Sequence, residues 1–162
     1  MEAAGGFRAF RWNWPDGLRI VVATPAVGLA TAKARAALPD AVPRRDAIFN
    51  LQRVVALVHA LQNGNDGELR EAVQDRWHQP ARAALVPLLR EVISLEDPDV
   101  LGSFLSGAGP SVAVLARRDF ARIEGVLAAM YARAGVEVSI RTLAVHHSPQ
   151  LAGAGSGHGR TV

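Results

Sequence analysis

The sequence has 162 residues, of which 49% are hydrophobic and 20% charged, a balance that indicates one globular domain and excludes a disordered chain. No apolar stretch approaches the ~20 residues that span a bilayer, and no secretory signal is recognisable, so we expect a cytoplasmic protein without a membrane partner. The absence of cysteine excludes disulfides and thiolate chemistry, and the scattered arginines behind the net charge of +3 form no stripe for nucleic acid.

The first third of the chain predicts two strands and two helices. Large apolar and polar residues alternate over 7–14, which indicates a half-buried strand, and the β-branched run 18–25 indicates a central strand. Thr31 is placed to cap a short helix. The longest helix is expected over 46–63, because its apolar residues keep the spacing of one helix face. Those residues are Ile48, Leu51, Val54, Val55, Val58 and Leu61.

Three further helical segments are expected downstream. Asp66 is placed to cap a helix that runs towards Trp77, and the prolines within 80–95 indicate two short helical pieces. Asp119 is placed to cap another helix, which Gly135 ends. Its expected buried face consists of Phe120, Ile123, Leu127 and Met130.

Three more strands complete the predicted fold. The segments 101–105 and 111–115 read as buried strands on either side of a glycine-rich turn, and 136–145 reads as a final strand. The element order predicts an α+β domain, a mostly antiparallel sheet with helices packed on one face. We expect these boundaries: 1–17, a strand remnant of the sheet or of a preceding domain; 18–150, the main domain; 151–162, a disordered tail.

The turn "LSGAGPSVAVL", residues 105–115, leaves two functions open. Glycine and proline occur in ordinary hairpin turns, yet successive small residues also point backbone N–H groups into an anion-binding concavity. The usual phosphate-binding motifs are absent, because no G-x-x-x-x-G-K-[ST] or G-x-G-x-x-G occurs.

Histidine and arginine supply the remaining candidate chemistry. No histidine has metal-ligand spacing; the five are His59, His78, His146, His147 and His158. Arg35 and Arg82 each lie in the first turns of an expected helix, where a guanidinium suits capture of a carboxylate or phosphate. Taken alone, each of these arginines is more typical of a solvated surface residue or a salt-bridge partner. Asp75 and His78 are similarly compatible with a helix cap or an ion pair on a helix.

Three segments taken in order resemble the C-terminal half of the GHMP kinases, and of their homoserine kinases in particular. They are "PAVGLATAKARAALPDAVPRRDAIFN", "DRWHQPARAALVP" and "LSGAGPSVAVL". The middle segment resembles D-x-x-H-[EQ]-P-x-R-x-x-L-[IV]-P, the pattern that separates homoserine kinases from mevalonate and galactose kinases. The resemblance extends over residues 18–145.

The resemblance implies a ferredoxin-like domain that serves an ATP-dependent phosphotransfer to the hydroxyl of L-homoserine, on the route to threonine. Arg35 and Arg82 match arginines that hold the substrate carboxylate, and Thr31 matches a threonine near the reacting hydroxyl. The glycine turn matches a motif that supports the nucleotide site; its residues are Ser106, Gly107, Ala108 and Gly109. Phosphoryl transfer depends mainly on such positioning and on charge stabilisation.

The sequence also departs from that family. The loop that wraps ATP and the residues that hold Mg²⁺ belong to an N-terminal half that the resemblance does not reach. Ala30 stands where serine is usual, and "EDPDV", residues 96–100, stands where small residues are usual. We therefore expect an incomplete gene, a split subunit or an isolated domain, inactive alone, which forms a homodimer or binds the N-terminal domain. Another GHMP small-molecule kinase and a non-catalytic interaction module are the alternatives.

Overall fold

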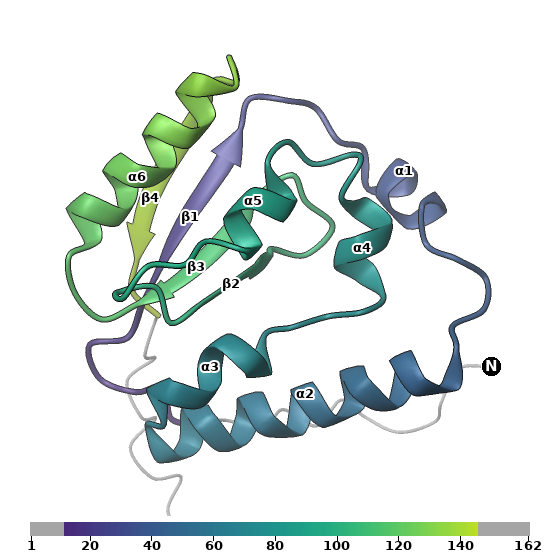
Figure 1. The fold of residues 1–162 in the computed structure, drawn as a ribbon, viewed down its shortest axis with the longest axis horizontal. Coiled ribbons are helices and arrows are strands. Elements are labelled where there is room, and N and C mark those ends of the chain that lie inside the picture. The colour runs from purple at the N-terminus through teal and green to yellow at the C-terminus, as the bar shows by residue number, and fades with distance from the viewer. Residues whose placement is uncertain (1–11, 146–162) are drawn as a thin grey trace, which may run out of the picture.

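The computed structural model of this chain describes residues 12–145 (Figure 1). Its elements, in chain order, are β1 (Arg19–Pro25), α1 (Thr31–Ala36), α2 (Arg44–Asn63), α3 (Asp66–Ala72), α4 (His78–Arg82), α5 (Leu89–Ile93), β2 (Gly102–Leu105), β3 (Val112–Ala116), α6 (Phe120–Arg133) and β4 (Val138–Leu143). No helix within this part of the chain is both long and apolar enough to cross a bilayer.

The four strands form one sheet in the order β2-β3-β1-β4, and every neighbouring pair is antiparallel. The glycine turn joins β2 to β3 as a hairpin, in which Leu105 lies opposite Val112. Strand β1 occupies the centre, with Val21 opposite both Val114 and Thr142. The predicted α+β fold with an antiparallel sheet is therefore confirmed.

One face of the sheet is covered by α5 and α6 and contains the main core (Figure 1). Val21 on β1 and Val114 on β3 point to this face, where they meet Ile123, Leu127 and Tyr131 of α6; all five are buried. Because side chains alternate along a strand, these residues belong to a single face. The predicted layer of helices against the sheet is present here.

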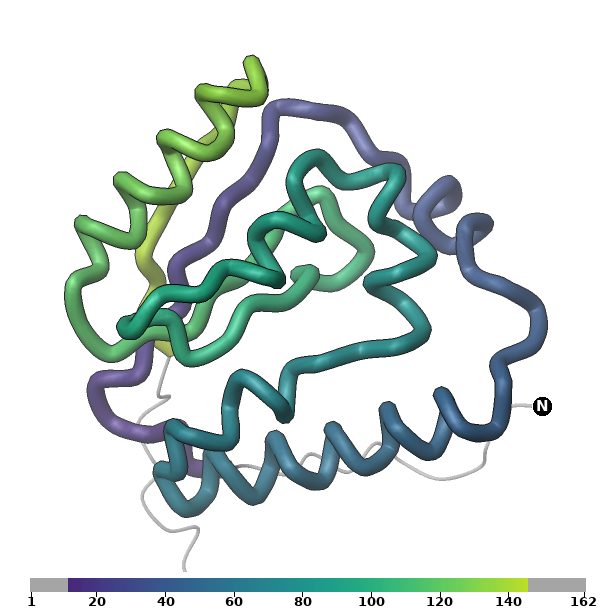
Figure 2. Tube along the Cα trace, viewed as in Figure 1, coloured from purple at the N-terminus to yellow at the C-terminus, as the bar shows by residue number. Residues whose placement is uncertain are grey.

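The opposite face of the sheet is covered less completely. Leu115 and Phe104 point to it and pack with the last turns of α2 and with α3, in a smaller cluster that includes Leu57 and Leu69. The chain trace shows α2 running past the sheet and on towards the end where α1 lies (Figure 2). Only the C-terminal part of this 20-residue helix therefore contacts the sheet.

Local details differ from the sequence predictions at several points. Thr31 is the first residue of α1 and not its cap, because the N-cap position is Ala30 and no side chain caps the helix. Likewise Asn65 precedes α3, and Asp66 forms an ion pair with Arg117 instead. Of the predicted strand 7–14, residues 12–14 are not in a strand and the rest lies outside the described residues, as does the predicted tail 151–162.

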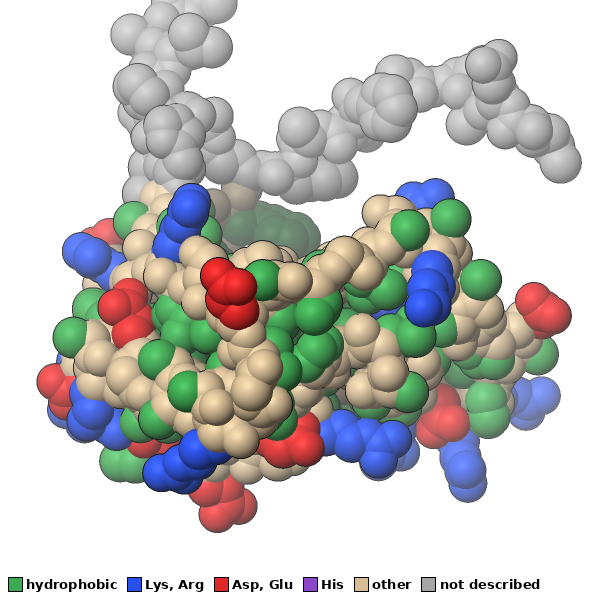
Figure 3. Space-filling view, turned by 90° about the horizontal axis from the view of Figure 1, so that it is seen from above, with side chains coloured by type: hydrophobic (Ala, Val, Ile, Leu, Met, Phe, Trp, Pro, Cys, Tyr) green, Lys and Arg blue, Asp and Glu red, His purple; other side chains and the backbone are tan. Residues whose placement is uncertain are grey.

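The surface seen from above carries both kinds of charge. Basic and acidic side chains alternate around the margin of this face, and hydrophobic side chains gather towards its middle (Figure 3).

Candidate functional site

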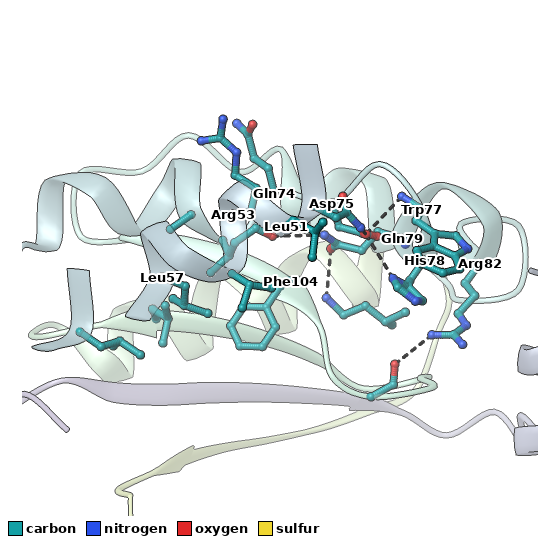
Figure 4. Close-up of a pocket in the computed structure, with 18 of the residues that line it drawn as sticks. Leu51, Arg53, Leu57, Gln74, Asp75, Trp77, His78, Gln79, Arg82 and Phe104 are labelled. Atoms are coloured by element: carbon teal, nitrogen blue, oxygen red, sulfur yellow. Dashed lines mark hydrogen bonds and ion pairs between the residues drawn. The ribbon is translucent and has the colours of Figure 1, made fainter. Parts of the chain in front are cut away.

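Arg82 lies in the middle one of the three segments that resemble the GHMP kinases. Its side chain contacts the backbone of the other two. This side chain is only 7% exposed. Its Nε donates a hydrogen bond to the carbonyl of Ala34 in α1 (3.0 Å), and its Nη1 donates to the carbonyl of Gly107 in the glycine turn (3.2 Å; Figure 4). Because a buried charge is costly unless it is paired or hydrogen-bonded, these contacts hold the guanidinium in one orientation.

The guanidinium of Arg82 keeps unused hydrogen-bonding capacity. A guanidinium has five N–H donors, and the two carbonyls use one from Nε and one from Nη1. The side chain lines a cavity of about 820 Å³, in which Gly107 and His78 also lie. A carboxylate or phosphate that enters this end of the cavity meets a fixed, cationic donor.

Asp75 organises the turn that leads into α4. Its carboxylate accepts hydrogen bonds from Asn50 Nδ2 of α2 (2.5 Å), from the backbone N–H of Trp77 (3.1 Å) and from that of Gln79, and His78 Nδ1 lies 3.2 Å away. Burial raises the pKa of this carboxyl, but the hydrogen bonds outweigh burial and hold the pKa below its ordinary value. Asp75 is therefore ionised and stabilises the turn. This favours its interpretation as a helix cap over a role in binding.

Gln79 fixes the other side of α4, and the sequence analysis did not identify it. Its side chain is 7% exposed. Its Oε1 accepts from the N–H of Leu105 at the end of β2 (3.1 Å), and its Nε2 donates to the carbonyl of Val73 (3.3 Å). The glutamine of the H-Q-P pattern was the available signal, but a sequence does not show which backbone groups lack a partner. Gln79 and Arg82 together attach α4 to the end of β2 and to the glycine turn that follows it.

The glycine turn is a tight hairpin whose backbone needs glycine. Gly107 and Gly109 have φ values of +59° and +88°, which L side chains rarely adopt. A Cβ at Gly109 would lie 2.9 Å from Cγ2 of Val86 and 3.2 Å from Cδ1 of Leu105. Ser106 accepts a hydrogen bond from the N–H of Gly109 at 3.1 Å and donates its own N–H to Ser111. The hairpin is thus confirmed, and anion binding by the turn stays a prediction.

Thr31 and Arg35 occupy a different surface from Arg82. Both side chains are exposed on α1, and neither lines the cavity. Arg35 follows Ala34, whose carbonyl accepts the hydrogen bond from Arg82. Arg82 therefore contacts the backbone of α1, and no hydrogen bond links it to the side chains of Thr31 and Arg35.

The cavity has an apolar wall and a polar end (Figure 4). It lies between α2 and the less covered face of the sheet, where Leu51, Leu57 and Phe104 form part of the wall. Asp75, His78, Gln79 and Arg82 lie at the other end. Such an arrangement of apolar walls with a few polar groups is typical of binding sites and of protein interfaces.

The unusual segment 96–100 has a structural explanation. Asp97 accepts two hydrogen bonds of 2.7 Å from Arg122 of α6, and Asp99 accepts from Arg118 (2.7 Å) and Arg122 (2.6 Å). The hydrogen bonds from Arg122 lower the pKa of Asp97 to about 2, from a usual 3.8. These pairs fasten the segment before β2 to the start of α6.

The described residues do not fit a magnesium site. Within residues 12–145, no three histidine, aspartate or glutamate side chains gather in a way that would hold a metal ion. The carboxylate of Asp75 is engaged by its own turn, and His59 is exposed beside Asn63. The His146–His147 pair and His158 lie outside the described residues.

Comparison with known proteins gives the family. Residues 57–136 match the family described as GHMP kinases C terminal. The chain is 43% identical over 120 residues to a homoserine kinase of Solibacter usitatus, covering 74% of this chain and 40% of that protein. It is 39% identical over 132 residues to a homoserine kinase of Persephonella marina, covering 81% and 44%.

A solved structure has the same fold. The crystal structure of homoserine kinase from Cytophaga hutchinsonii superposes with a TM-score of 0.79 at 24% identity, over 84% of this chain and 44% of that one. The chain thus spans about two fifths of the length of the relatives that it matches. It belongs to the GHMP kinase family, and the described residues have the fold of that family's C-terminal domain.

Proposed function

We propose that this chain supplies the substrate-binding part of an ATP-dependent homoserine kinase. The complete reaction transfers the γ-phosphoryl group of ATP to the hydroxyl of L-homoserine and releases ADP. The observation that carries the proposal is the buried, pre-oriented guanidinium of Arg82, with donors to spare, inside the segment that resembles homoserine kinases. The relatives named homoserine kinase support the same activity.

In this proposal Arg82 binds the carboxylate of L-homoserine. A planar guanidinium offers two parallel N–H groups to a carboxylate, and its fixed orientation lowers the entropy lost on binding. Arg35 and Thr31 do not line the cavity. In this proposal they therefore contact the substrate from the exposed side of α1, Arg35 as a second cation and Thr31 near the substrate hydroxyl. The turn from Ser106 to Gly109 supports the nucleotide. Holding the substrate still is the main contribution that such residues make to phosphoryl transfer.

The ATP cradle and the Mg²⁺ ligands come from another polypeptide segment in this proposal. The 162 residues contain no phosphate-binding loop of the familiar types, and the described residues do not fit a magnesium site. We therefore expect no measurable phosphorylation of L-homoserine by the 162-residue chain alone. Turnover by the purified chain would contradict the proposal that another segment supplies the ATP-binding loop and the Mg²⁺ ligands.

A thermal-shift titration with L-homoserine tests the role of Arg82. We expect L-homoserine to raise the melting temperature of the wild-type chain and to leave that of Arg82→Ala unchanged, because a lost charge-assisted hydrogen bond costs about 1.5–3 kcal/mol. Arg90→Ala is the matched control, since Arg90 is an exposed arginine on α5 outside the cavity. Equal shifts in all three proteins would remove Arg82 from the substrate site.

An interaction module with the same fold is the second candidate function. The exposed apolar side chains of α2 favour it, because such surfaces mark protein contacts. This alternative predicts that L-homoserine causes no shift even when a complementing N-terminal segment is bound. Another GHMP kinase would instead respond to a different alcohol acceptor in the same assay.

A further inference from the structure

Strand β4 forms an edge of the sheet, and in the described part of the chain it pairs on one side only, with β1. The N–H of Ala26 donates to the carbonyl of Glu137 at the start of this pairing (2.8 Å). Because the direction of the backbone groups alternates along an antiparallel strand, every second residue after Glu137 also points to β1. The N–H and C=O groups of Val138, Ile140 and Thr142 therefore point away from the sheet.

The opposite edge of the sheet, strand β2, is protected. Its outward N–H at Leu105 donates to Oε1 of Gln79 (3.1 Å). Helix α3 packs so closely on Gly102 that a Cβ there would lie 3.2 Å from the carbonyl oxygen of Leu69. Folded proteins usually block sheet edges, because an unpaired edge binds other strands. Strand β4 has neither a proline nor a bulge to block it, and its register with β1 is regular.

Two copies of β4 fit each other in one antiparallel register, with Ile140 opposite Ile140 of a second copy. This register places Val138 opposite Thr142 and Ser139 opposite Arg141. Each outward-pointing residue then meets an outward-pointing residue, so the pairs exchange N–H···O=C hydrogen bonds. The register centred on Ser139 or on Arg141 leaves one of these residues without a partner in the strand. The one centred on Arg141 also sets two cations directly opposite each other, which is unfavourable.

Helix α6 lies over this edge of the sheet and leaves space beside it. The helix and β4 occupy the same margin of the molecule (Figure 1). Oγ1 of Thr142 donates to Oε1 of Glu124 (2.5 Å), which identifies the side of α6 that faces the edge. The neighbours of Glu124 one helical turn away on that side are Ala121 and Ala128, both exposed. Since a methyl group occupies little space, a second helix can pack beside α6 at an ordinary distance of about 8–10 Å.

We propose that β4 pairs with β4 of a second copy of this chain, so that one antiparallel sheet continues through both copies. The two-fold axis passes beside Ile140, and the two α6 helices lie next to each other. Such an interface is closed, because the same patch of both copies is covered and no open β4 edge is left. The self-complementary register and the absence of opposed like charges assign the edge to a second copy. This interface is separate from the proposed substrate site, because β4 does not line the cavity that contains Arg82.

Charge substitutions at Ser139 test the register in the full 162-residue chain. Ser139 is exposed and lies opposite Arg141 of the second copy twice in the dimer. We expect Ser139→Asp to lower the dimer Kd ~10-fold and Ser139→Arg to raise it ~10-fold, because opposite charges attract across a strand pair and like charges repel. Sedimentation equilibrium at low ionic strength measures each Kd. Ser94→Asp and Ser94→Arg, at an exposed serine outside β4 and α6, are the matched controls and should leave the Kd unchanged.

A second variant tests the helix side of the interface. Ala128→Arg places a long cation where the two α6 helices meet, and we expect a monomer whose circular dichroism matches the wild type. A wild-type chain that stays monomeric at every concentration would overturn the proposal. So would a dimer that responds neither to the Ser139 substitutions nor to Ala128→Arg. A dimer weakened instead by Val55→Lys, at a 70% exposed side chain, would assign self-association to α2.

The sedimentation experiment contains neither ATP nor L-homoserine, so its result does not depend on the proposed function. A dimer with the expected response at Ser139, together with no L-homoserine thermal shift, would keep the β4 interface and remove the substrate site. A thermal shift that depends on Arg82 in a monomeric chain would keep the substrate site and remove the interface.

Discussion

The two faces of the sheet use the same kinds of side chain in opposite ways. On the face covered by α5 and α6, Val114 and Leu127 are fully buried, whereas on α2 the chemically equivalent Val55 and Leu51 are 70% and 68% exposed. The first face is complete within the described residues. The second presents apolar surface that lowers the free energy of the system only when another element covers it.

The largest difference should appear in the free energy of unfolding when one apolar side chain is shortened in the main core and one on the exposed side of α2. We expect Leu127→Ala to lower the free energy of unfolding by about 2–5 kcal/mol, since it removes fully buried methyl groups and leaves a cavity. Val55→Ala on α2 should change it by less than about 0.5 kcal/mol. Urea denaturation of both variants measures the contrast, and similar losses would show that the α2 face is already covered.

Substitutions in the glycine turn should lower stability as substitutions in the main core do, because Gly109 packs against Val86 of that core. We expect Gly109→Ala to destabilise the chain by about 1–3 kcal/mol, since its φ is +88° and its new Cβ would lie 2.9 Å from Val86 Cγ2.

Gly125→Ala is the matched control for Gly109→Ala. Gly125 lies in α6 with no atom within 4 Å of its Cβ position. There the substitution should raise stability by about 0.5–1 kcal/mol, because alanine favours a helix. A Gly109→Ala variant as stable as this control would show that neither the backbone conformation of Gly109 nor its contact with Val86 limits stability.

A smaller effect is expected in acid at the segment before β2, which ion pairs attach to the start of α6. Hydrogen bonds from Arg122 lower the pKa of Asp97 to about 2, so its contribution to stability is present above its unfolded value of 3.8 and is lost as the pH falls towards 2. Asp97→Asn should therefore lose less stability than the wild type between about pH 5 and about pH 2.5.

Urea midpoints at the two pH values measure the effect at Asp97. Glu96→Gln, a change at an exposed neighbouring carboxylate, serves as the control and should follow the wild type. An identical acid response of Asp97→Asn and the wild type would mean that the pair with Arg122 does not contribute to stability.

The regular elements were predictable because each depends on a local pattern. The apolar runs around the glycine turn gave β2 and β3, and the β-branched run gave β1. The spacing of apolar residues gave α2 and α6, and the α+β class followed from their order. In these segments the spacing of the apolar residues indicates the type of element, because those residues lie on the face that meets the core.

The site was predictable only where a side chain belongs to a motif. Arg82, named from its motif, lines the cavity, and its role in substrate binding stays a prediction. The contact of Gln79 with Leu105 joins residues 26 apart, and no local pattern encodes it. The spacing on α2 predicted an apolar stripe without indicating what covers it, because periodicity reports a face and not its neighbour. Thr31 was misplaced as a cap because preferred residue types do not fix the first helical residue.

The most direct measurement is the phosphorylation of L-homoserine by ATP in a mixture of this chain with the N-terminal segment of the Solibacter usitatus enzyme. We predict turnover in the mixture, none in either protein alone, and none in a mixture made with Arg82→Ala. A mixture that forms the complex yet does not phosphorylate L-homoserine, or one in which Arg82→Ala is as active as the wild type, would contradict the proposed function.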